Sequence, residues 1–367
     1  MRLDWLELRE FRSYQHLEFH PDPGVNVLVG PNGAGKTNVL EAIAYLSALR
    51  SFRRAPDGAM IRSDGGEAII RGSFLRESGE LRVEVEIPAD GRRRVLLNGK
   101  RPKRHADVPA EVPVVAFLPD DLDLVKRGPA LRREYVDDLG AQLAPTVGAD
   151  QADYEKVLRQ RNSLLRREGR MADLLTLEVW DERLAEAGSR LLVNRLTLLD
   201  RLSPVLQAAY KTVGGPEGKL SVFYESSWAG SVGADAPRRD APYVPLLRED
   251  LRARRERDLD QRTTTTGPHR DEPVLGLDGR DVRTQASQGE QRSAALSLRL
   301  AAYRLLEERH GRPPILVLDD VFSELDHSRV AGVLELLPRG QVFVTTARDD
   351  EVPVEGRRWS VDEGRVE

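Results

Sequence analysis

The 367-residue chain contains no cysteine. Disulfide bonds, thiol nucleophiles and cysteine zinc sites are therefore excluded, and any helical arm must end without a Cys-x-x-Cys zinc clasp. The six histidines are scattered, without the H-E-x-x-H spacing or a similar one, and predict no metal site.

Long apolar segments are also lacking. The longest apolar runs are far below the roughly 20 residues that span a bilayer. Charged residues interrupt Met1-Arg-Leu-Asp-Trp5, where a signal peptide would need an apolar stretch. We therefore expect a cytoplasmic protein with no membrane partner, and its length is sufficient for two cores.

Residues 30–37, Gly-Pro-Asn-Gly-Ala-Gly-Lys-Thr, fit the phosphate-loop pattern G-x-x-x-x-G-K-[ST]. The pattern predicts backbone N–H groups around a β-phosphate, Lys36 on the β/γ-phosphates and the Thr37 hydroxyl on Mg²⁺. Val25–Val29 is typical of a buried strand and Lys36–Leu46 of a helix, whose N-terminus attracts anions. This context disfavours a chance Gly-rich turn. The predicted nucleotide-binding residues of the loop are Gly30, Pro31, Asn32, Gly33, Ala34, Gly35, Lys36, Thr37 and Asn38.

An acidic pair, Asp319-Asp320, follows the apolar run Ile315–Leu318 near the other end of the chain. Asp319 is the expected metal ligand together with Thr37, which lies 282 residues earlier. The strands that flank one site thus come from opposite ends of the chain, and a large insertion must split the nucleotide domain.

Ser287-Gln-Gly-Glu-Gln291 stands directly before a strong helical pattern, Ser293–Glu307. A Ser and a Gly at a helix N-terminus offer a hydroxyl, backbone N–H groups and the helix dipole to an anion. One interpretation is an ordinary serine N-cap. The other is a second anion site for a nucleotide on another subunit, because the phosphate loop already surrounds its own phosphates.

This segment resembles the signature motif of ABC-type ATPases, and Ser323-Glu-Leu-Asp326 is similar to their D-loop. Three further motifs complete a resemblance to the bacterial RecF family of SMC-like recombination mediators, which runs from residue 1 to about residue 347. They are Phe11-Arg12-Ser13-Tyr14, Gly267-Pro-His-Arg-Asp271 and Tyr154 with Arg161-Asn162.

The resemblance implies an α/β fold, namely an ABC-type ATPase head with a mixed sheet and a phosphate-loop core, carrying an inserted helical second lobe. It implies ATP and Mg²⁺ as cofactors, and the absence of an Asn-Lys-x-Asp motif disfavours GTP. Catalysis would fall to Asp320 as the base, with Lys36 and Asp319. Further nucleotide contacts are implied for Arg12, Ser287, Gly289, Gln291 and Asp326.

The chain departs from the ABC pattern at three places. Asp320 stands where many of these ATPases have Glu, so the base is one methylene shorter. No glutamine marks a Q-loop, although Phe117–Leu122 resembles a RecF segment there, and Thr345-Thr346 replaces the switch histidine. Slow hydrolysis is the expected consequence, and the resemblance implies that this weak ATPase activity depends on DNA.

Residues 91–105 hold seven Lys or Arg and no acid, within a chain of net charge −4. Asn98-Gly99 favours a type I′ hairpin, and clusters of this kind bind phosphate backbones. A solvated charged face is the alternative. The predicted DNA contacts are Arg92, Arg93, Arg94, Lys100, Arg101, Lys103 and Arg104. Weaker candidates are Arg50, Arg53, Arg54, Arg159, Arg161, Arg166, Arg167 and Arg170. The resemblance to RecF makes His269 and Arg270 candidates for contact with DNA or with a second subunit.

The expected domains are residues 1–120 plus 263–367 for the ATPase head and 121–262 for a helical arm lobe. Strand patterns dominate the first part, at Leu3–Leu8, His16–Phe19, Val25–Val29, Ala68–Phe74, Leu81–Ile87, Arg94–Leu97 and Val112–Phe117. Helical patterns follow, at Ala130–Leu143, Tyr154–Arg167, Leu174–Tyr210 and Tyr243–Arg257. Thr263–Thr266 is expected to be a strand that enters a Gly-Pro turn.

Together these features predict a clamp in which MgATP joins two subunits head to tail on double-stranded DNA and hydrolysis releases it. The resemblance implies service at gapped or junction DNA, help in loading RecA, the partners RecR and RecO, and association with the nucleoid. Two other functions remain open: a nucleotide-gated protein-interaction module, and an ABC transporter subunit, which the large, charged insertion disfavours.

Overall fold

The computed structural model describes residues 1–63, 65–229, 243–322, 327–334 and 340–367. They form two compact units. The first unit comprises residues 1–121, 212–215 and 295–367, and the second comprises 122–211 and 216–294. Residues 263–294, which the sequence analysis placed with the head, therefore group with the helical unit.

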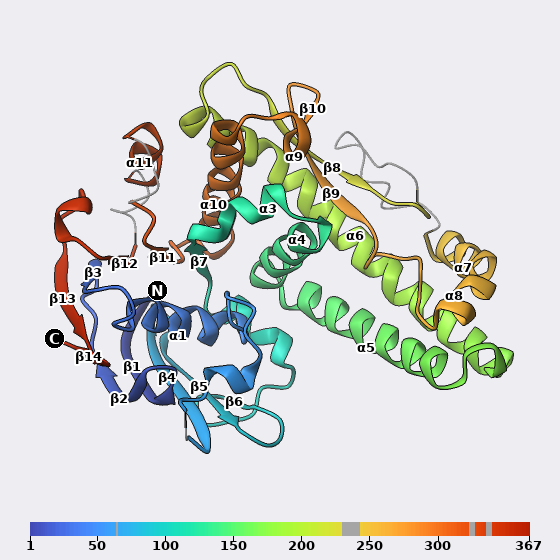
Figure 1. The fold of residues 1–367 in the computed structure, drawn as a ribbon, viewed down its shortest axis with the longest axis horizontal. Coiled ribbons are helices and arrows are strands. Elements are labelled where there is room, and N and C mark those ends of the chain that lie inside the picture. Colours follow the sequence, from blue (N-terminus) through green and yellow to red (C-terminus); the bar gives the residue numbers. More distant parts are fainter. Residues whose placement is uncertain (64, 230–242, 323–326, 335–339) are drawn as a thin grey trace. The chain divides into compact units, whose positions relative to one another are not determined.

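The first unit contains two sheets (Figure 1). One is antiparallel with the strand order β2-β1-β4-β5-β6. Its strands are β1 (Arg2–Phe11), β2 (Tyr14–Phe19), β4 (Glu67–Arg76), β5 (Gly79–Pro88) and β6 (Arg94–Leu97). All five were expected from the alternation of apolar and polar residues, and these expectations are confirmed.

The other sheet is mixed, with the order β14-β13-β3-β12-β11-β7. Its strands are β3 (Val25–Val29), β7 (Val114–Phe117), β11 (Ile315–Asp319), β12 (Val342–Thr346), β13 (Arg357–Asp362) and β14 (Arg365–Val366). Only β14 pairs antiparallel. Strands β11 and β12 are buried throughout and apolar up to their polar carboxyl ends, as expected for parallel strands covered on both faces.

Helix α1 (Lys36–Ala48) contacts β4 and β5 of the first sheet and β7, β11 and β12 of the second. One core therefore contains apolar side chains of both sheets and of the helix. Because β3, β12 and β11 are parallel neighbours, their carboxyl ends lie at one edge of the sheet, where β3 leads into α1. Shorter helical segments of this unit are η1 (Asp57–Met60), η2 (His105–Asp107), α2 (Val108–Glu111), η3 (Pro119–Leu122), α11 (His327–Leu334) and η6 (Asp349–Glu351).

The second unit is mainly helical, and in Figure 1 its helices α5 and α6 run side by side. Its helices are α3 (Asp123–Lys126), α4 (Pro129–Leu143), α5 (Pro145–Glu168), η4 (Gly169–Met171), α6 (Leu174–Val213), α7 (Tyr243–Ala253), α8 (Arg255–Gln261) and α9 (Val282–Gln285). Helix α6 extends into residues of the first unit, and α10 (Gln288–His310) begins in the second unit and ends in the first. The predicted helices are confirmed, although the expected helix Tyr243–Arg257 is divided between α7 and α8.

Two features of the second unit differ from the sequence prediction. A three-stranded sheet, β10-β9-β8, was missed; its strands are β8 (Leu220–Glu225), β9 (Glu272–Leu277) and β10 (Arg280–Asp281). Thr263–Thr266 is not a strand, because its threonines bond to α8 instead of to a sheet: the Thr265 N–H and hydroxyl both donate to Asp258 Oδ1. Among the described helices, none has the length and apolar character needed to cross a membrane.

Candidate nucleotide site

The phosphate loop lies in the turn between β3 and α1, as predicted. Two of its glycines have positive φ, 86° at Gly33 and 109° at Gly35, a backbone region that side chains disfavour. A Cβ on Gly35 would lie 2.8 Å from Ser13 Oγ and 2.9 Å from Tyr14 Oη, so glycine is needed there for space as well. The β1–β2 turn thus packs directly on the loop.

Lys36 is nearly buried, and its ammonium group donates to the carbonyl oxygens of Gly30 (2.6 Å) and Pro31 (2.9 Å). Burial lowers the pKa of Lys36, and the carboxylates of Asp320 and Asp319 oppose this effect. Neutral carbonyls are the only hydrogen-bond partners described for the ammonium group. The arrangement suits a cation that exchanges weak ligands for the charged oxygens of a phosphate.

Thr37 and Asp319 meet at the edge where β3 and β11 end. Thr37 Oγ1 donates to Asp319 Oδ1 over 2.7 Å, and Thr345 Oγ1 on β12 donates to the same oxygen over 2.7 Å. A carboxylate and a hydroxyl side by side are the hard oxygen ligands that Mg²⁺ prefers. The donor set of this site therefore fits the expected metal.

Asp320, the predicted base, follows β11 with φ of 50°, a left-handed conformation that is uncommon outside glycine. Its N–H donates to Thr345 Oγ1 (3.0 Å). The predicted catalytic residues Lys36, Asp319 and Asp320 lie together, since both carboxylates act on the lysine ammonium group.

Arg12 is held by a residue that the sequence analysis missed. Its guanidinium forms a bidentate pair with Glu41 (2.8 and 2.9 Å) and donates to the Ala59 carbonyl (2.8 Å). Glu41 is fully buried in α1, where it also accepts from the Ser51 hydroxyl. The sequence offered one indication of this role, because Glu41 is an acidic residue within the apolar helical pattern of Lys36–Leu46. Whether Arg12 contacts nucleotide stays a prediction.

Beside this pair, α1 is joined to the β1–β2 turn. Asn38 Nδ2 donates to Ser13 Oγ (3.0 Å), and Arg53 Nη1 donates to Asn38 Oδ1 (3.2 Å). Arg53, a weaker candidate for DNA contact, is thus half-exposed at the first turn of α1. An open cavity of about 540 Å³ next to Arg12 is lined by Glu10, Arg12, Arg62, Ser63, Gly65 and Gly66.

The signature-like segment belongs to the second unit. Ser287 is the residue before α10, and it forms a capping box: its N–H donates to Glu290 Oε2 (2.7 Å), and the Glu290 N–H donates to Ser287 Oγ (3.3 Å). The N-cap interpretation is therefore correct, and it leaves the anion interpretation open, because the exposed helix N-terminus remains.

The other residues of this segment that were predicted to contact nucleotide differ in burial and in hydrogen bonding. Gln291 is buried, and its Nε2 donates to the carbonyls of Val282 and Arg283 (3.1 Å each), so its amide supports the chain itself. Gly289 lies half-buried in the first turn of α10. The predicted D-loop with Asp326 falls outside the described residues.

The basic segment forms the predicted two-residue turn, with positive φ at Asn98 and Gly99 between Leu97 and Lys100. Three of its seven cations have partners supplied by the fold. Arg93 donates to the Leu49 carbonyl (2.5 Å), Arg94 pairs with Glu86 (3.1 Å) and Arg104 pairs with Asp107 (3.2 Å). The remaining four side chains are exposed and have no hydrogen-bond or ion-pair partner in the described ranges; they are Arg92, Lys100, Arg101 and Lys103.

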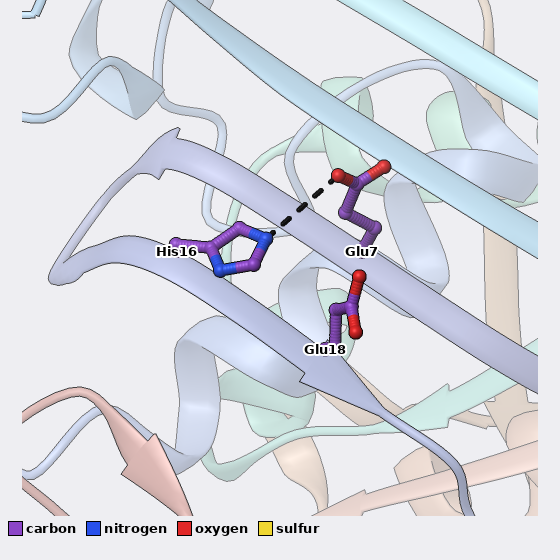
Figure 2. Close-up of side chains that lie close together, drawn as sticks. All are labelled: Glu7, His16 and Glu18. Carbon is purple, nitrogen blue, oxygen red and sulfur yellow. Dashed lines mark ion pairs between the residues drawn. The ribbon is translucent and has the colours of Figure 1, made fainter.

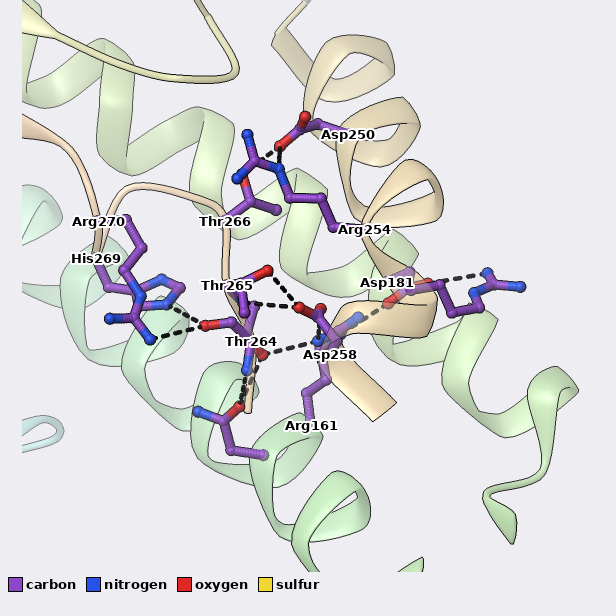
Figure 3. Close-up of polar contacts among 12 residues, drawn as sticks. Arg161, Asp181, Asp250, Arg254, Asp258, Thr264, Thr265, Thr266, His269 and Arg270 are labelled. Carbon is purple, nitrogen blue, oxygen red and sulfur yellow. Dashed lines mark hydrogen bonds and ion pairs between the residues drawn. The ribbon is translucent and has the colours of Figure 1, made fainter. Parts of the chain in front are cut away.

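Of the weaker arginine candidates in the inserted region, Arg161 is a structural residue. It is fully buried and donates to Asp181 (2.7 Å), Asp258 (2.8 Å) and the Thr264 hydroxyl (2.8 Å). Figure 3 shows it below the Thr264–Thr266 segment, where it joins α5, α6 and α8. Some charged residues of these helices therefore pair inside the unit. Exposed Arg159, Arg167 and Arg170 pair with neighbouring acids.

His269 and Arg270 both bond the Thr264 carbonyl, as Figure 3 shows. The second ring nitrogen of His269 contacts the Tyr154 hydroxyl (2.7 Å). Burial lowers the pKa of His269 to about 4, so its ring is neutral at physiological pH. Arg270 remains exposed at the surface of the second unit.

Glu7, His16 and Glu18 gather across β1 and β2 (Figure 2), although the histidine spacing predicted no metal site. Glu7 accepts from Arg9 (2.5 Å) and Arg71 (3.0 Å), and its Oε1 lies 3.8 Å from His16 Nε2. Burial favours a raised pKa for Glu7, but the hydrogen bonds from Arg71 and Arg9 outweigh it and lower the pKa. The two arginines occupy both oxygens of the carboxylate, so the cluster is an ion-pair network.

The profile of the family described as RecF/RecN/SMC N terminal domain matches residues 2–360. The chain is 41% identical to the DNA replication and repair protein RecF of Streptomyces avermitilis, and the alignment covers all of both chains. It is 40% identical to the DNA replication and repair protein RecF of Acidothermus cellulolyticus, with 100% of this chain and 99% of the relative covered. A solved structure of the recombination mediator protein RecF with ATP, in the RecFOR pathway, matches with a TM-score of 0.91 and 30% identity over 100% and 96% of the two chains.

A Pyrococcus furiosus Smc head domain matches with a TM-score of 0.54 at 18% identity, which supports the fold alone. The predicted fold class, an ABC-type head with an inserted helical lobe, is thereby confirmed. With full-length identity above 40% to curated relatives, this chain belongs to the RecF family of DNA replication and repair proteins.

Proposed function

We propose that this protein is an ATP-dependent DNA clamp of recombinational repair. In this proposal MgATP joins two copies head to tail on double-stranded DNA, and slow hydrolysis releases them. The meeting of Thr37 and Asp319 beside the phosphate loop carries the proposal, because residues from the two ends of the chain that could hold Mg²⁺ and phosphate lie side by side there.

ATP binding is supported by the loop geometry and by the RecF relative solved with ATP. The phosphates would lie on the loop N–H groups and on Lys36, at the N-terminus of α1. The open cavity beside Arg12 offers space for the ribose and base, because the β1–β2 turn that carries Arg12 bonds to Asn38 in the first turn of α1.

Thr37 Oγ1 and the Asp319 carboxylate would hold Mg²⁺. When bound, the ion supplies charge neutralisation on the phosphate oxygens. Asp320 would orient the attacking water and accept its proton, a task that a carboxylate within hydrogen-bond reach performs. The Asp320 side chain is one methylene shorter than the glutamate of many ABC-type ATPases, so its reach to the water is shorter, which supports slow turnover.

Dimerisation rests on the N-terminus of α10. Ser287 stands directly before α10 and is exposed together with Gln288, at a helix end that carries N–H groups and a positive dipole end. In a symmetric dimer each such helix would cover the γ-phosphate held by the other copy, so two shared sites would bury two nucleotides.

DNA contact is assigned to the four unpaired cations at residues 92, 100, 101 and 103. Their contacts to phosphate would add affinity without reading sequence. By relationship to the RecFOR pathway of the solved relatives, RecR and RecO would be the protein partners and RecA loading at gapped or junction DNA the outcome.

Sedimentation velocity with and without ATP and duplex DNA tests the proposal. A clamp should be a monomer alone and a dimer with ATP, and its DNA affinity should fall linearly on a log–log plot against salt. An ATP-dependent shift with no DNA binding would instead favour the nucleotide-gated interaction module, and no ATP-dependent shift would contradict both.

A further inference from the structure

Thr345 is the residue before the last of β12, the strand between the phosphate-loop strand β3 and the acidic strand β11. Its side chain is buried, and its hydroxyl has two described partners. It donates to Asp319 Oδ1 (2.7 Å) and accepts from the Asp320 N–H (3.0 Å). One hydroxyl group therefore holds both members of the acidic pair.

The backbone of Asp320 explains why this matters. Its φ of 50° lies in the left-handed region, which a residue with a side chain keeps only when its surroundings enforce it. The Thr345 hydroxyl bonds the N–H of that same residue. Without the bond, Asp320 would be free to relax to a negative φ, and its carboxylate would then point in another direction.

Thr345 also acts on the orientation of Asp319. The Oδ1 atom accepts from Thr37 on one side and from Thr345 on the other, both over 2.7 Å. Strand register places Thr345 opposite Asp319, so the contact follows from the sheet itself. Valine has nearly the same shape as threonine and suits a buried strand. Packing alone therefore does not require a hydroxyl at this position.

We propose that Thr345 is a positioning residue for ATP hydrolysis, whose hydroxyl fixes the backbone of Asp320 and the carboxylate of Asp319 in one arrangement. The inference rests on the proposed function and deepens it. The residue acts through the acidic pair and needs no contact with nucleotide, so it should affect turnover more than nucleotide affinity.

The test compares Thr345→Val, which removes the hydroxyl, with Thr345→Ser, which keeps it. Thr346→Val is the matched control, because Thr346 is buried in the same strand and its hydroxyl donates to the Arg348 carbonyl (2.8 Å). The measurements are steady-state kcat, the Kd for ATP, the lifetime of the ATP-induced dimer and the melting temperature of each variant.

Thr345→Val should lower kcat by at least tenfold and keep the Kd for ATP within about threefold of the parent value. It should also lengthen the lifetime of the ATP-induced dimer. Thr345→Ser should restore kcat to within about threefold of the parent, and Thr346→Val should keep the parent kcat with the same melting temperature as Thr345→Val. Because both residues act on one step, Thr345→Val added to Asp320→Asn should not change the dimer lifetime further.

A parent-like kcat in Thr345→Val, or no rescue by serine, overturns the inference. So does a tenfold weaker Kd with unchanged kcat, because the hydroxyl would then serve binding. If Asp320→Asn itself hydrolyses ATP at the parent rate, the proposed catalytic role of Asp320 fails instead. The two failures are therefore distinguishable.

Discussion

Thr37 Oγ1 and Asp319 Oδ1 are joined by a 2.7 Å hydrogen bond across 282 residues of sequence. The bond links the first turn of α1, the helix that follows β3, to the carboxyl end of β11, and β3 and β11 flank β12 in the mixed sheet. The whole second unit lies between these two residues in the sequence, as an insertion between the two halves of the proposed nucleotide site. A change that disturbs α1 or β11 therefore acts on both partners of this hydrogen bond, which are the proposed magnesium ligands.

Lys36→Ala should weaken ATP binding by roughly 10- to 100-fold, the loss expected for removing a charge-assisted hydrogen bond to phosphate. The fold should persist, because within the described part of the chain the lysine donates only to two loop carbonyls. Isothermal titration calorimetry with ATP measures the effect. Lys100→Ala removes an exposed lysine of the same unit and serves as the control; equal affinities in the two variants would refute the role of Lys36.

Patterns local in sequence predicted the parts of this site whose geometry is local. The loop from Gly30 to Thr37 is a strand–turn–helix motif, so spacing alone located it, and the apolar run before Asp319 located β11. Glu41 was missed as a site residue, and Thr345 was noted only as standing where ABC-type ATPases have the switch histidine, because the roles of both come from packing. Neither a strand threonine nor a helix glutamate has a distinctive pattern until the neighbouring strand or the Arg12 side chain is placed beside it.

Replacing Arg92, Lys100, Arg101 and Lys103 by alanine should weaken duplex binding for all sequences and reduce the salt slope by up to about 3.5 units. Fluorescence anisotropy over a salt series measures both quantities. The control is Arg94→Ala with Arg104→Ala, because these cations already pair with Glu86 and Asp107. An equal loss in the control, or an unchanged slope in the fourfold variant, would place the DNA site elsewhere.

The sequence also overestimated how many charges are free. The basic segment has no acid within residues 91–105, but Asp57, Glu86 and Asp107 come from neighbouring segments to meet three of its arginines. Arg161 looked like one more surface cation of a helix, and the fold buries it between two aspartates. Ion pairs between distant segments have no sequence period, so charge runs alone do not reveal them.

Ser287→Arg should leave ATP binding by the phosphate loop intact and block the ATP-induced dimer, because a bulky cation would stand where the partner's γ-phosphate is proposed to lie. The same change removes the serine N-cap, at a cost of about 1 kcal/mol. Glu290→Ala controls for that loss, since it breaks the other half of the capping box and should still dimerise. ATP-dependent dimers of Ser287→Arg in sedimentation would refute the assignment.

His269 should make the second unit sensitive to acid. Its folded pKa of about 4 lies below the ordinary 6.5, so the folded state favours the neutral ring. The associated stability is complete above pH 6.5 and is lost as the pH falls towards 4. The difference in unfolding free energy between the parent and His269→Gln should shrink by about 3 kcal/mol from pH 7 to pH 4. Urea denaturation measures it, and a difference that does not change with pH would contradict the buried neutral ring.

The most direct test of the shared nucleotide site mixes two variants, neither of which should form the ATP-induced dimer by itself. Lys36→Ala lacks a working phosphate loop and keeps Ser287, whereas Ser287→Arg keeps its loop and lacks the covering helix. In a head-to-tail dimer one of the two sites then combines an intact Lys36 with an intact Ser287. Sedimentation velocity with ATP should show dimers in the mixture and monomers in each variant alone; monomers in the mixture, or dimers of either variant alone, would contradict the account.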